Sequence, residues 1–467
     1  MNDPSDSDPN PKASVPRRTF LASTAAATAG FTIVPRHVLG GQGKPAPSDK
    51  LNIAGIGVGG MGKSNLGKCE NENIVALCDV DFALADPVFK KYPNAKQYRD
   101  FRVMLDQQKD IDAVIVATPD HTHAVIAMAA MQRKKHVYVQ KPLTHSVSEA
   151  RLLTETARQY GVATQMGNQG HSGEGIRLLC EWVWDGAIGP IREAHAWTNR
   201  PVWPSGVEVG RPVETPAVPP GLDWDLWLGP ARQRPYHPTY HPAKWRAWWD
   251  FGTGSLGDMA CHIVDPLFWA LKLKYPVSVE ANISKYWQAF FEQTQPKNEM
   301  FPRSTIVRYK FPAREGMPEL DLTWWDGGLL PARPAGLEPG RRMGDEDGGI
   351  LLVGAEGSIM AGCYGESPRI VPESRMKRYR RPSRTLDRIP EGQDGHEKDW
   401  IRSCKDGKPA SSNFEYSGPL SETVLMGNLA IRFPDRELLW NGEKMEVTND
   451  ADANAYVRPE YREGWHV

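Results

Sequence analysis

A turn of three glycines constrains this chain of 467 residues more than any other feature. The run Gly57-Val-Gly59-Gly60-Met61-Gly62 has the spacing G-x-G-x-x-G and directly follows the short apolar run 51–56. A second apolar run, 74–78, ends at Asp79, about 20 residues further on. Glycines in such a turn allow the tight bend, the approach of a pyrophosphate to the backbone and close packing of helix on strand. The sequence therefore predicts a dinucleotide-binding unit.

A carboxylate at the end of the second strand selects between the two nicotinamide dinucleotides. Asp79 can accept hydrogen bonds from the adenosine ribose hydroxyls, and its charge repels a 2′-phosphate, so NAD is expected rather than NADP. The predicted cofactor-binding residues are Gly57, Gly59, Gly60, Met61, Gly62, Asp79, Thr118, Pro119, His123, Gln140 and Lys141.

Strand and helix patterns alternate after the glycine turn. Apolar runs at 112–117, 136–139 and 162–165 predict strands, and 124–131 and 147–160 predict helices. This alternation indicates a doubly wound α/β Rossmann domain over 50–170. The alternative is a nucleotide-free flavodoxin-like sheet, which would leave the glycine turn and Asp79 unexplained.

Polar residues follow two of these strands, at the edge where parallel sheets place ligands. His121 and His123 could be metal ligands, but no third ligand stands at a supporting spacing, so no metal is expected and helix capping by Asp120 or Thr122 is the preferred interpretation. Lys141 directly follows a buried strand and precedes a proline, which favours a chemical role over that of a solvated surface lysine.

Charge and hydropathy exclude several classes of protein. Lys plus Arg number 56 against 57 Asp plus Glu, a formal charge of -1, which offers no basic surface to nucleic acid or to an anionic membrane. Beyond the amino-terminal leader, no run of about 18 apolar residues predicts a membrane span.

The amino terminus has the pattern of an export signal. Arg17-Arg18 precede a weakly apolar run, 22–34, which predicts a twin-arginine leader over residues 1–46 and export to the periplasm. A basic, unstructured tail is the alternative. The six cysteines form no C-x-x-C pair, and free thiols fit a protein that folds in the reducing cytoplasm before transport.

The pattern changes after residue 171. Apolar or alternating runs at 277–283, 304–311, 320–325 and 349–353 predict a mainly antiparallel open sheet, and hence an α+β domain over 171–467. Residues 334–349 and 375–384 are predicted to be loops. A late helix is expected at 419–431.

Tryptophan is unusually frequent, with eight of the 16 between Trp197 and Trp269. The Pro- and Trp-rich connection 197–249 is too long for a simple link and too aromatic for disorder. We expect it to cover the cleft opposite the nicotinamide, with Trp227, Trp248 and His237 contacting a sugar. Packing of one domain on the other is the open alternative.

A carboxylate and an imidazole lie one helical turn apart in the run 254–265. Asp258 and His262 stand at i and i+4, where the carboxylate can fix the imidazole tautomer and raise its basicity. A pair on a helix surface is the alternative. Asp265 is a weaker candidate on about the same face.

These motifs together resemble the Gfo/Idh/MocA oxidoreductase family. The resemblance rests on 57–62, Asp79, the run 117–123 and Gln140-Lys141-Pro142. Family members carry Glu-Lys-Pro at the last of these motifs, so Gln140 is a departure that removes a negative charge.

The resemblance implies roles for individual residues. It makes Lys141 the catalytic lysine, His262 the acid/base, and Asp258 its partner or a substrate ligand. It also implies that the second sheet forms the substrate domain and the subunit interface of a homo-oligomer.

The resemblance further implies an NAD-dependent oxidoreductase that acts on a sugar, polyol or glycoside. An exported enzyme would hold its NAD tightly, because no free pool surrounds it. One alternative is an NAD-dependent glycosidase that oxidises its substrate transiently and eliminates the glycosidic bond. Another is a sugar-binding protein without catalysis.

Overall fold

Two β-sheets organise the part of the chain that the computed structural model describes, residues 49–467. Both belong to one compact unit, Leu51–Val467. The predicted leader, residues 1–46, lies outside the described residues. Within the described part of the chain, no helix is long and apolar enough to cross a membrane.

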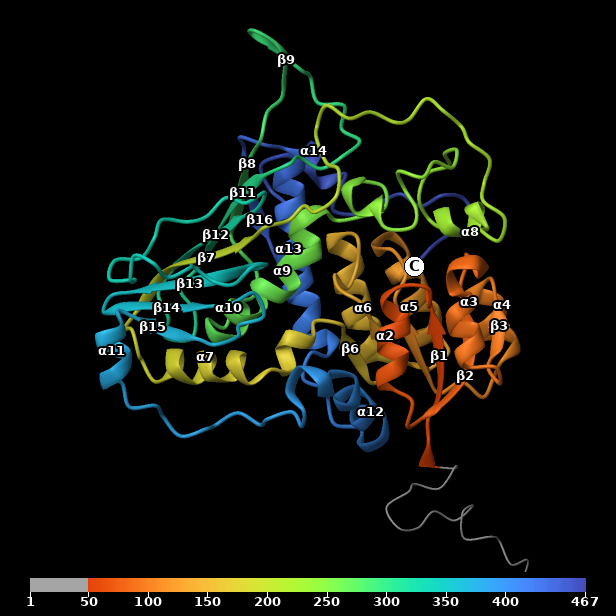
Figure 1. Ribbon diagram of the computed structural model, residues 1–467, viewed down its shortest axis with the longest axis horizontal. Helices are drawn as coiled ribbons and strands as arrows, with labels where there is room; N and C mark the ends of the chain where they lie inside the picture. The colour runs from red at the N-terminus through yellow and green to blue at the C-terminus, as the bar shows by residue number, and fades with distance from the viewer. Residues whose placement is uncertain (1–48) are drawn as a thin grey trace, which may run out of the picture. The chain divides into compact units, whose positions relative to one another are not determined.

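The first sheet has six parallel strands in the order β3-β2-β1-β4-β5-β6, which confirms the doubly wound fold (Figure 1). The strands are β1 (Asn52–Ile56), β2 (Asn73–Cys78), β3 (Lys96–Tyr98), β4 (Ala113–Val116), β5 (His136–Val139) and β6 (Thr164–Met166). The helices between them are α2 (Met61–Lys68), α3 (Phe82–Lys91), α4 (Phe101–Gln107), α5 (His123–Gln132) and α6 (Val147–Tyr160). The order reverses between β1 and β4, so the ligand crevice of such a sheet belongs at their carboxyl ends.

Two positions of the glycine turn require glycine because neighbouring backbone atoms lie too close for a side chain. Gly57 has a φ of +77°, and a Cβ there would lie 2.7 Å from the carbonyl oxygen of Ala117. A Cβ on Gly62 would lie 2.3 Å from the carbonyl oxygen of Gly57. Only glycine therefore allows α2 to start directly against β1 and β4.

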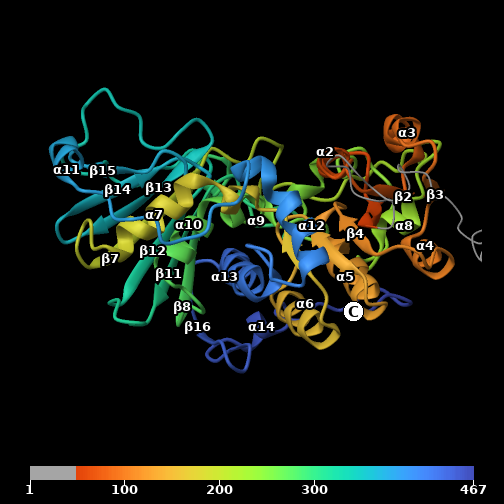
Figure 2. The same cartoon turned by 90° about the horizontal axis from the view of Figure 1, so that it is seen from below.

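The second sheet has nine strands and is antiparallel except where β7 pairs with β12. Its strands, in spatial order, are β15 (Arg369–Val371), β14 (Gly357–Ala361), β13 (Gly348–Gly354), β7 (Ile191–Thr198), β12 (Leu320–Trp325), β11 (Thr305–Phe311), β8 (Ser278–Ile283), β16 (Glu437–Asn441) and β17 (Glu446–Val447). Helices of this part of the chain include α7 (Glu174–Trp184), α9 (Gly254–Ile263), α10 (Asp265–Ala270) and α13 (Phe414–Arg432), and α9 and α13 pack against the sheet (Figure 2).

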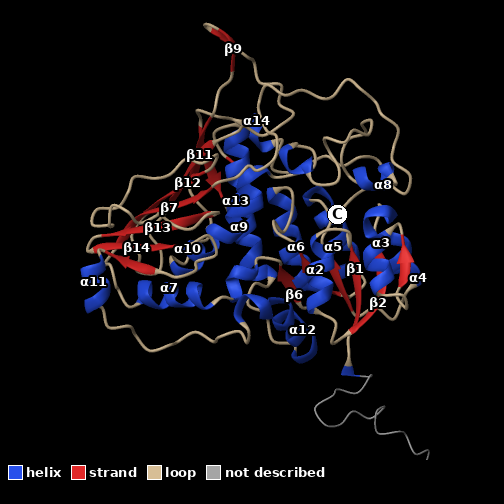
Figure 3. Ribbon diagram, in the orientation of Figure 1, coloured by secondary structure: helices blue, strands red, loops and turns tan. Residues whose placement is uncertain are grey.

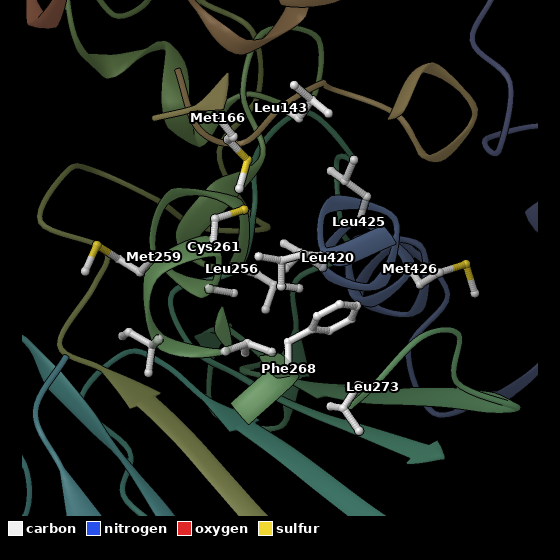
Figure 4. Packing of buried hydrophobic residues seen from close by; sticks show 14 of the residues in the cluster. Leu143, Met166, Leu256, Met259, Cys261, Phe268, Leu273, Leu420, Leu425 and Met426 are labelled. Atoms are coloured by element: carbon white, nitrogen blue, oxygen red, sulfur yellow. The ribbon is translucent and has the colours of Figure 1, made fainter. Parts of the chain in front are cut away.

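Helix α13 joins the two sheets. It packs against α6 of the first sheet and against α9 and β8 of the second. Figure 4 shows side chains of α9, α10 and α13, among them Leu256, Phe268 and Leu420, gathered in one buried apolar cluster. The two sheets therefore share a continuous core.

Some elements differ from the sequence-based expectations. The late helix starts at Phe414 rather than at 419, because the Asn413 side chain caps it by accepting a hydrogen bond from the backbone N–H of Glu415. The predicted loop 375–384 begins inside a short helix, α11 (Glu373–Arg378).

Several elements had no expectation from the sequence. They include α8 (Trp224–Leu228), α12 (His396–Asp406), α14 (Ala451–Asn454) and the hairpin of β9 (Trp287–Ala289) and β10 (Glu292–Gln293). Figure 3 shows this hairpin projecting from the sheet on long loops, and its tip residues Phe290 and Phe291 are exposed. By contrast, α12 buries Trp400 completely in the apolar core of the first sheet.

Candidate active site

A cavity of about 400 Å³ lies at the carboxyl edge of the first sheet. The predicted site residues on its wall are Gly57, Gly59, Gly60, Met61, Asp79, Thr118, Pro119, Gln140, Lys141, Trp227 and Asp258. Those that do not line it are Gly62, His123, His237, Trp248 and His262. The structure thus brings most of the predicted cofactor residues together.

Asp79 is held in place by the glycine turn. Its carboxylate accepts hydrogen bonds from the backbone N–H groups of Gly59, at 3.0 Å, and Asp81, at 2.9 Å. Burial raises the pKa of Asp79, and these backbone donors oppose the shift. A carboxylate has about four acceptor positions, so oxygen lone pairs are left for ribose hydroxyls. The glycine cradle and this carboxylate fit NAD.

Lys141 and Asp258 form the charged end of the cavity. The Lys141 ammonium lies 2.9 Å from Asp258 Oδ1 and 2.6 Å from the Asp258 carbonyl oxygen. Two guanidinium groups lie near the same carboxylate, Arg246 at 3.4 Å and Arg200 at 3.8 Å. Burial alone would raise the pKa of Asp258, but the charges of Lys141, Arg246 and Arg200 outweigh it and lower the pKa to about 2. Asp258 is therefore a permanent anion.

The predicted hydrogen bond between Asp258 and His262 is absent from the described residues. Asp258 turns toward Lys141, because an ammonium is a stronger hydrogen-bond donor to a carboxylate than a neutral imidazole. His262 Nδ1 is buried without a hydrogen-bond partner in the described chain, and the ring packs edge-on against Tyr364. Burial, then the charge of Lys141, lowers the pKa of His262 well below its usual range, so the ring is neutral.

Asp265 lies away from the cavity. Its carboxylate is fully buried and is hydrogen-bonded by His171, Asn168 and Tyr416. It serves the packing of α10, so its candidacy as a site residue was wrong.

The polar run after β4 ties backbone segments together. The ring nitrogens of His121 lie 3.2 Å and 3.0 Å from the carbonyl oxygens of Phe251 and Trp227. Those of His123 lie 2.9 Å from the carbonyl oxygens of Pro142 and Thr118. The described residues contain no group of three or more potential metal ligands.

The capping roles expected in this run were wrong. Thr122 stands at the N-cap of α5 but makes no capping hydrogen bond, since its hydroxyl donates to the Pro119 carbonyl and pairs with the Thr118 hydroxyl at 2.7 Å. Asp120 accepts instead from the Thr253 hydroxyl at 2.5 Å. Both side chains fasten loops of the cavity wall.

The aromatic connection forms its own core, which we call the strap and define as residues 221–246. Trp227 stacks on Trp224 with ring centroids 4.6 Å apart and reaches the cavity. Trp248, just beyond the strap, is 1% exposed and donates its indole N–H to the Thr239 carbonyl, so it packs rather than contacts a ligand. His237 is half-buried beside Thr239, away from the cavity.

Hydrogen bonds fasten the strap over the cavity. The backbone N–H of Asp223 donates to the Val80 carbonyl at 2.8 Å, and Arg99 donates to the Gly221 carbonyl at 2.6 Å. His241 Nε2 lies 2.8 Å from Asp81 Oδ2. These contacts anchor the strap at the end of β2, beside Asp79. Its last residue, Arg246, lies 3.4 Å from Asp258, so the strap extends along the cavity to the Lys141–Asp258 pair.

Some cavity residues had no signal in the sequence. Trp465, near the carboxyl terminus, lines the cavity, and Arg462 holds the strap through Asp225 and the Gly229 carbonyl. Arg246, which approaches Asp258, stands in no motif that distinguishes it from the other arginines of the chain. No local pattern links residues so far apart in the chain.

Comparison with protein families places the chain. Residues 51–168 match the model described as "Oxidoreductase family, NAD-binding Rossmann fold", and residues 196–290 match "Oxidoreductase family, C-terminal alpha/beta domain", both of the Gfo/Idh/MocA group. The chain belongs to the Gfo/Idh/MocA oxidoreductase family. NAD is accordingly the cofactor that the domain of the first sheet binds.

Relatives of this Gfo/Idh/MocA chain include two kinds of enzyme. Inositol 2-dehydrogenase of Salmonella typhimurium is 28% identical over 152 residues, which are 31% of this chain and 44% of the relative. Alpha-N-acetylgalactosaminidase of Shewanella oneidensis is 28% identical over 207 residues, 38% of this chain and 45% of the relative. The matches therefore span less than half of each relative's length.

Solved structures share the fold of the Gfo/Idh/MocA chain. The WlbA dehydrogenase from Bordetella pertussis, in complex with NADH and UDP-GlcNAcA, has a TM-score of 0.57 and 15% identity, covering 84% of this chain and 99% of that one. Levoglucosan dehydrogenase, in complex with NADH and levoglucosan, has a TM-score of 0.55 and 18% identity over the same shares.

Proposed function

We propose that this chain is an NAD-dependent oxidoreductase acting on a hydroxyl group of a sugar, polyol or glycoside. The supporting observation is the Lys141–Asp258 pair, which stands in the same cavity as the glycine turn and Asp79. The cavity thus offers a dinucleotide cradle at one end and a partly buried cation for a substrate oxygen at the other. The named activities of the relatives agree with this class of substrate.

The residues divide the chemistry between them. Bound NAD supplies the acceptor for the hydride of a substrate carbinol. The Lys141 ammonium, directed by Asp258, stabilises the negative charge that develops on the carbinol oxygen. The proposed acceptor of the hydroxyl proton is His262, which is neutral but does not line the cavity, and the lowered pKa of its ring makes it a weak base.

A second candidate is a glycosidase in which oxidation is transient and NAD is regenerated within the cycle. The strap favours it, because a cofactor covered by the strap and Trp465 is suited to stay bound between turnovers. The relatives named as glycosyl hydrolase family 109 proteins point the same way. A binding protein without catalysis would have no need of the buried Lys141–Asp258 pair.

One experiment separates these functions. The protein is purified without added nucleotide, denatured, and its extract analysed for NAD by mass spectrometry. Sugars, polyols and aryl glycosides are then tested without added NAD. Accumulation of reduced nicotinamide supports the dehydrogenase, and release of phenol without it supports the glycosidase. If NAD neither co-purifies nor binds when added, and no compound reacts, the enzymatic proposal fails.

Lys141→Ala is the matching variant. It should lower kcat/KM by at least about two orders of magnitude, the usual loss when one electrostatic stabiliser is removed. Lys90→Ala, which removes an exposed lysine paired with Asp86 on α3, is the control. Equal activity of the two variants would contradict the role of Lys141.

Export by the twin-arginine route is part of the proposal. Arg17-Arg18 support it, and so do the six free cysteines in the described chain, of which five are buried. A protein of this kind is suited to folding, and to loading its NAD, in the reducing cytoplasm. Cell fractionation tests this, and a purely cytoplasmic full-length protein would contradict it.

A further inference from the structure

Gln140 stands where family members carry glutamate, and the structure shows how its amide is held. Gln140 follows β5, precedes Lys141 and lines the cavity. Its Nε2 donates to Asn65 Oδ1 at 3.0 Å. On the other side of the amide is Gly167, where a Cβ would lie 2.7 Å from Gln140 Nε2. The amide is therefore confined between a hydrogen bond and a backbone without a side chain.

The hydrogen bond continues to a carboxylate from a distant part of the chain. Asn65, on α2, is 3% exposed, and its Nδ2 donates to Glu397 Oε1 at 2.7 Å. Glu397 lies in the first turn of α12 and is 5% exposed. Its Oε2 is buried without a hydrogen-bond partner in the described chain. Asn65 is therefore the principal support of this buried anion.

Chemistry fixes the direction of this chain of hydrogen bonds. Burial raises the pKa of Glu397, and the hydrogen bond from Asn65 opposes this shift. Glu397 Oε1 accepts from Asn65, so Asn65 turns its NH₂ group toward Glu397 and its oxygen toward Gln140. Gln140 must then donate through its NH₂ group, which leaves Oε1 as an acceptor. The usual ambiguity of amide orientation is removed by one charge.

We propose that Glu397 is a positioning residue that acts through Asn65. It holds Gln140 with its amide oxygen available to the N–H group of the carboxamide of bound NAD. The inference rests on the proposed function in that it assigns this end of the cavity to the nicotinamide.

The arrangement also explains how the chain tolerates the loss of the glutamate. The negative charge is kept, but it is moved behind Asn65 and away from Lys141. The Lys141 ammonium then pairs with Asp258 alone in place of sharing itself with a second carboxylate next to it in the chain.

The test exchanges the amide of Gln140 and the carboxylate of Glu397, first one at a time and then together. In Gln140→Glu, two carboxylates face Asn65, which has one NH₂ group, and one buried carboxylate must meet the asparagine oxygen. NADH binding should weaken about tenfold or more, since an unsatisfied buried charged group carries a large penalty. In Glu397→Gln, the new amide can donate or accept, so the direction is lost and NADH binding weakens less.

The double variant Gln140→Glu/Glu397→Gln should recover. In this variant the carboxylate that replaces the Gln140 amide accepts from the Asn65 NH₂ group. The Asn65 oxygen accepts from the amide that replaces the Glu397 carboxylate, and an acceptor oxygen still faces the cavity.

Two measurements show whether the double variant recovers NADH binding and stability. The NADH dissociation constant, from fluorescence titration, should be closer to wild type in the double variant than in Gln140→Glu, and the thermal midpoint should recover with it. If Gln140→Glu is insoluble, recovery of soluble protein in the double variant is the expected result.

The control is Glu391→Gln, an exposed glutamate shortly before α12 that pairs with Lys398. Two outcomes would overturn the inference while the proposed function stands. One is that the effects of Gln140→Glu and Glu397→Gln on NADH affinity simply add in the double variant. The other is that Glu397→Gln behaves like Glu391→Gln in both affinity and thermal midpoint. A wild-type protein that binds no NADH would instead defeat the proposed function, and the inference with it.

Discussion

At the scale of single residues, one buried carboxylate holds the reactive end of the cavity together. Asp258 receives the Lys141 ammonium and lies within 4 Å of the guanidinium groups of Arg246 and Arg200. These cations come from three segments, so Asp258 fixes the position of Lys141 relative to both sheets. Removing the carboxylate would leave these partly buried positive charges without their shared partner.

Asp258→Asn is therefore expected to destabilise the fold in a way that depends on pH. The folded-state pKa of Asp258, about 2, lies below the ordinary value of 3.8, so its contribution is present above about pH 4 and is lost as the pH falls toward 2. The difference corresponds to about 2 kcal/mol. The unfolding free energies of wild type and variant should thus differ by a constant amount from pH 5 to 8 and converge at lower pH.

Urea unfolding followed by tryptophan fluorescence measures this difference. Asp86→Asn, which removes an exposed partner of Lys90, is the control and should change stability little at any pH. A difference that already shrinks between pH 7 and 6 would show that Asp258 is not held ionised by Lys141.

Local spacing was informative about residues whose role depends on their own strand or turn. The glycine turn, Asp79 and Lys141 each follow a strand of a parallel sheet, and such positions converge at one edge in any doubly wound fold. The prediction that His262 is the partner of Asp258 was wrong, because a spacing of i and i+4 compares residues on one helix only. The strongest partner, Lys141, is 117 positions away in the chain.

At the scale of elements, the strap has two fastenings that act from opposite ends of the chain. Arg99, before α4, donates to the Gly221 carbonyl. Arg462, near the carboxyl terminus, donates to the Gly229 carbonyl at 3.0 Å and to Gln233 at 2.7 Å. The strap can uncover Asp79 only if such contacts break, so they should govern how fast NAD leaves.

Arg462→Ala is expected to speed the release of NADH. The loss of several hydrogen bonds from a partly exposed guanidinium is worth about 1–2 kcal/mol, or roughly a tenfold faster dissociation. Stopped-flow fluorescence after dilution or chase measures the rate. Arg458→Ala, at an exposed arginine four residues earlier, is the control. An unchanged rate in Arg462→Ala would mean that the strap does not retain the cofactor.

Aromatic content predicted that the connection is ordered but not which surface it covers. Trp224, Trp227 and Trp248 pack with one another in a small core, and a cluster of this kind can be placed anywhere by a few backbone hydrogen bonds. Those bonds, such as Asp223 to Val80, involve backbone groups that every residue carries. The composition therefore predicted that the connection is ordered, but it did not predict which surface the connection covers.

At the scale of the whole molecule, the first sheet depends on the end of the chain. Helix α12 inserts Trp400 into the core beside Tyr138, and α13 packs along α6. The predicted division at residue 170 describes the sequence pattern well, but the structure completes the first sheet with residues from far later in the chain. Helix α12 is amphipathic but mostly charged, and its short apolar stripe around Trp400 does not indicate which part of the fold it covers.

Trp400→Ala should therefore impair the first sheet although it lies outside the predicted Rossmann range. Removal of a fully buried tryptophan costs about 3–5 kcal/mol, because it leaves a cavity that the neighbouring side chains fill only in part. Trp287→Ala removes a tryptophan that is 52% exposed on the projecting hairpin, and it should change stability by about 0.5 kcal/mol or less.

Chemical unfolding and NADH titration of the two variants, beside the isolated fragment 51–170, measure this dependence. We expect Trp400→Ala to weaken NADH binding together with stability. We expect the fragment to show no cooperative unfolding transition, since it lacks α12 and α13, whose side chains complete its apolar core. A fragment that folds and binds NADH alone would show that the first sheet is autonomous. It would also show that Trp400 only docks on a finished domain.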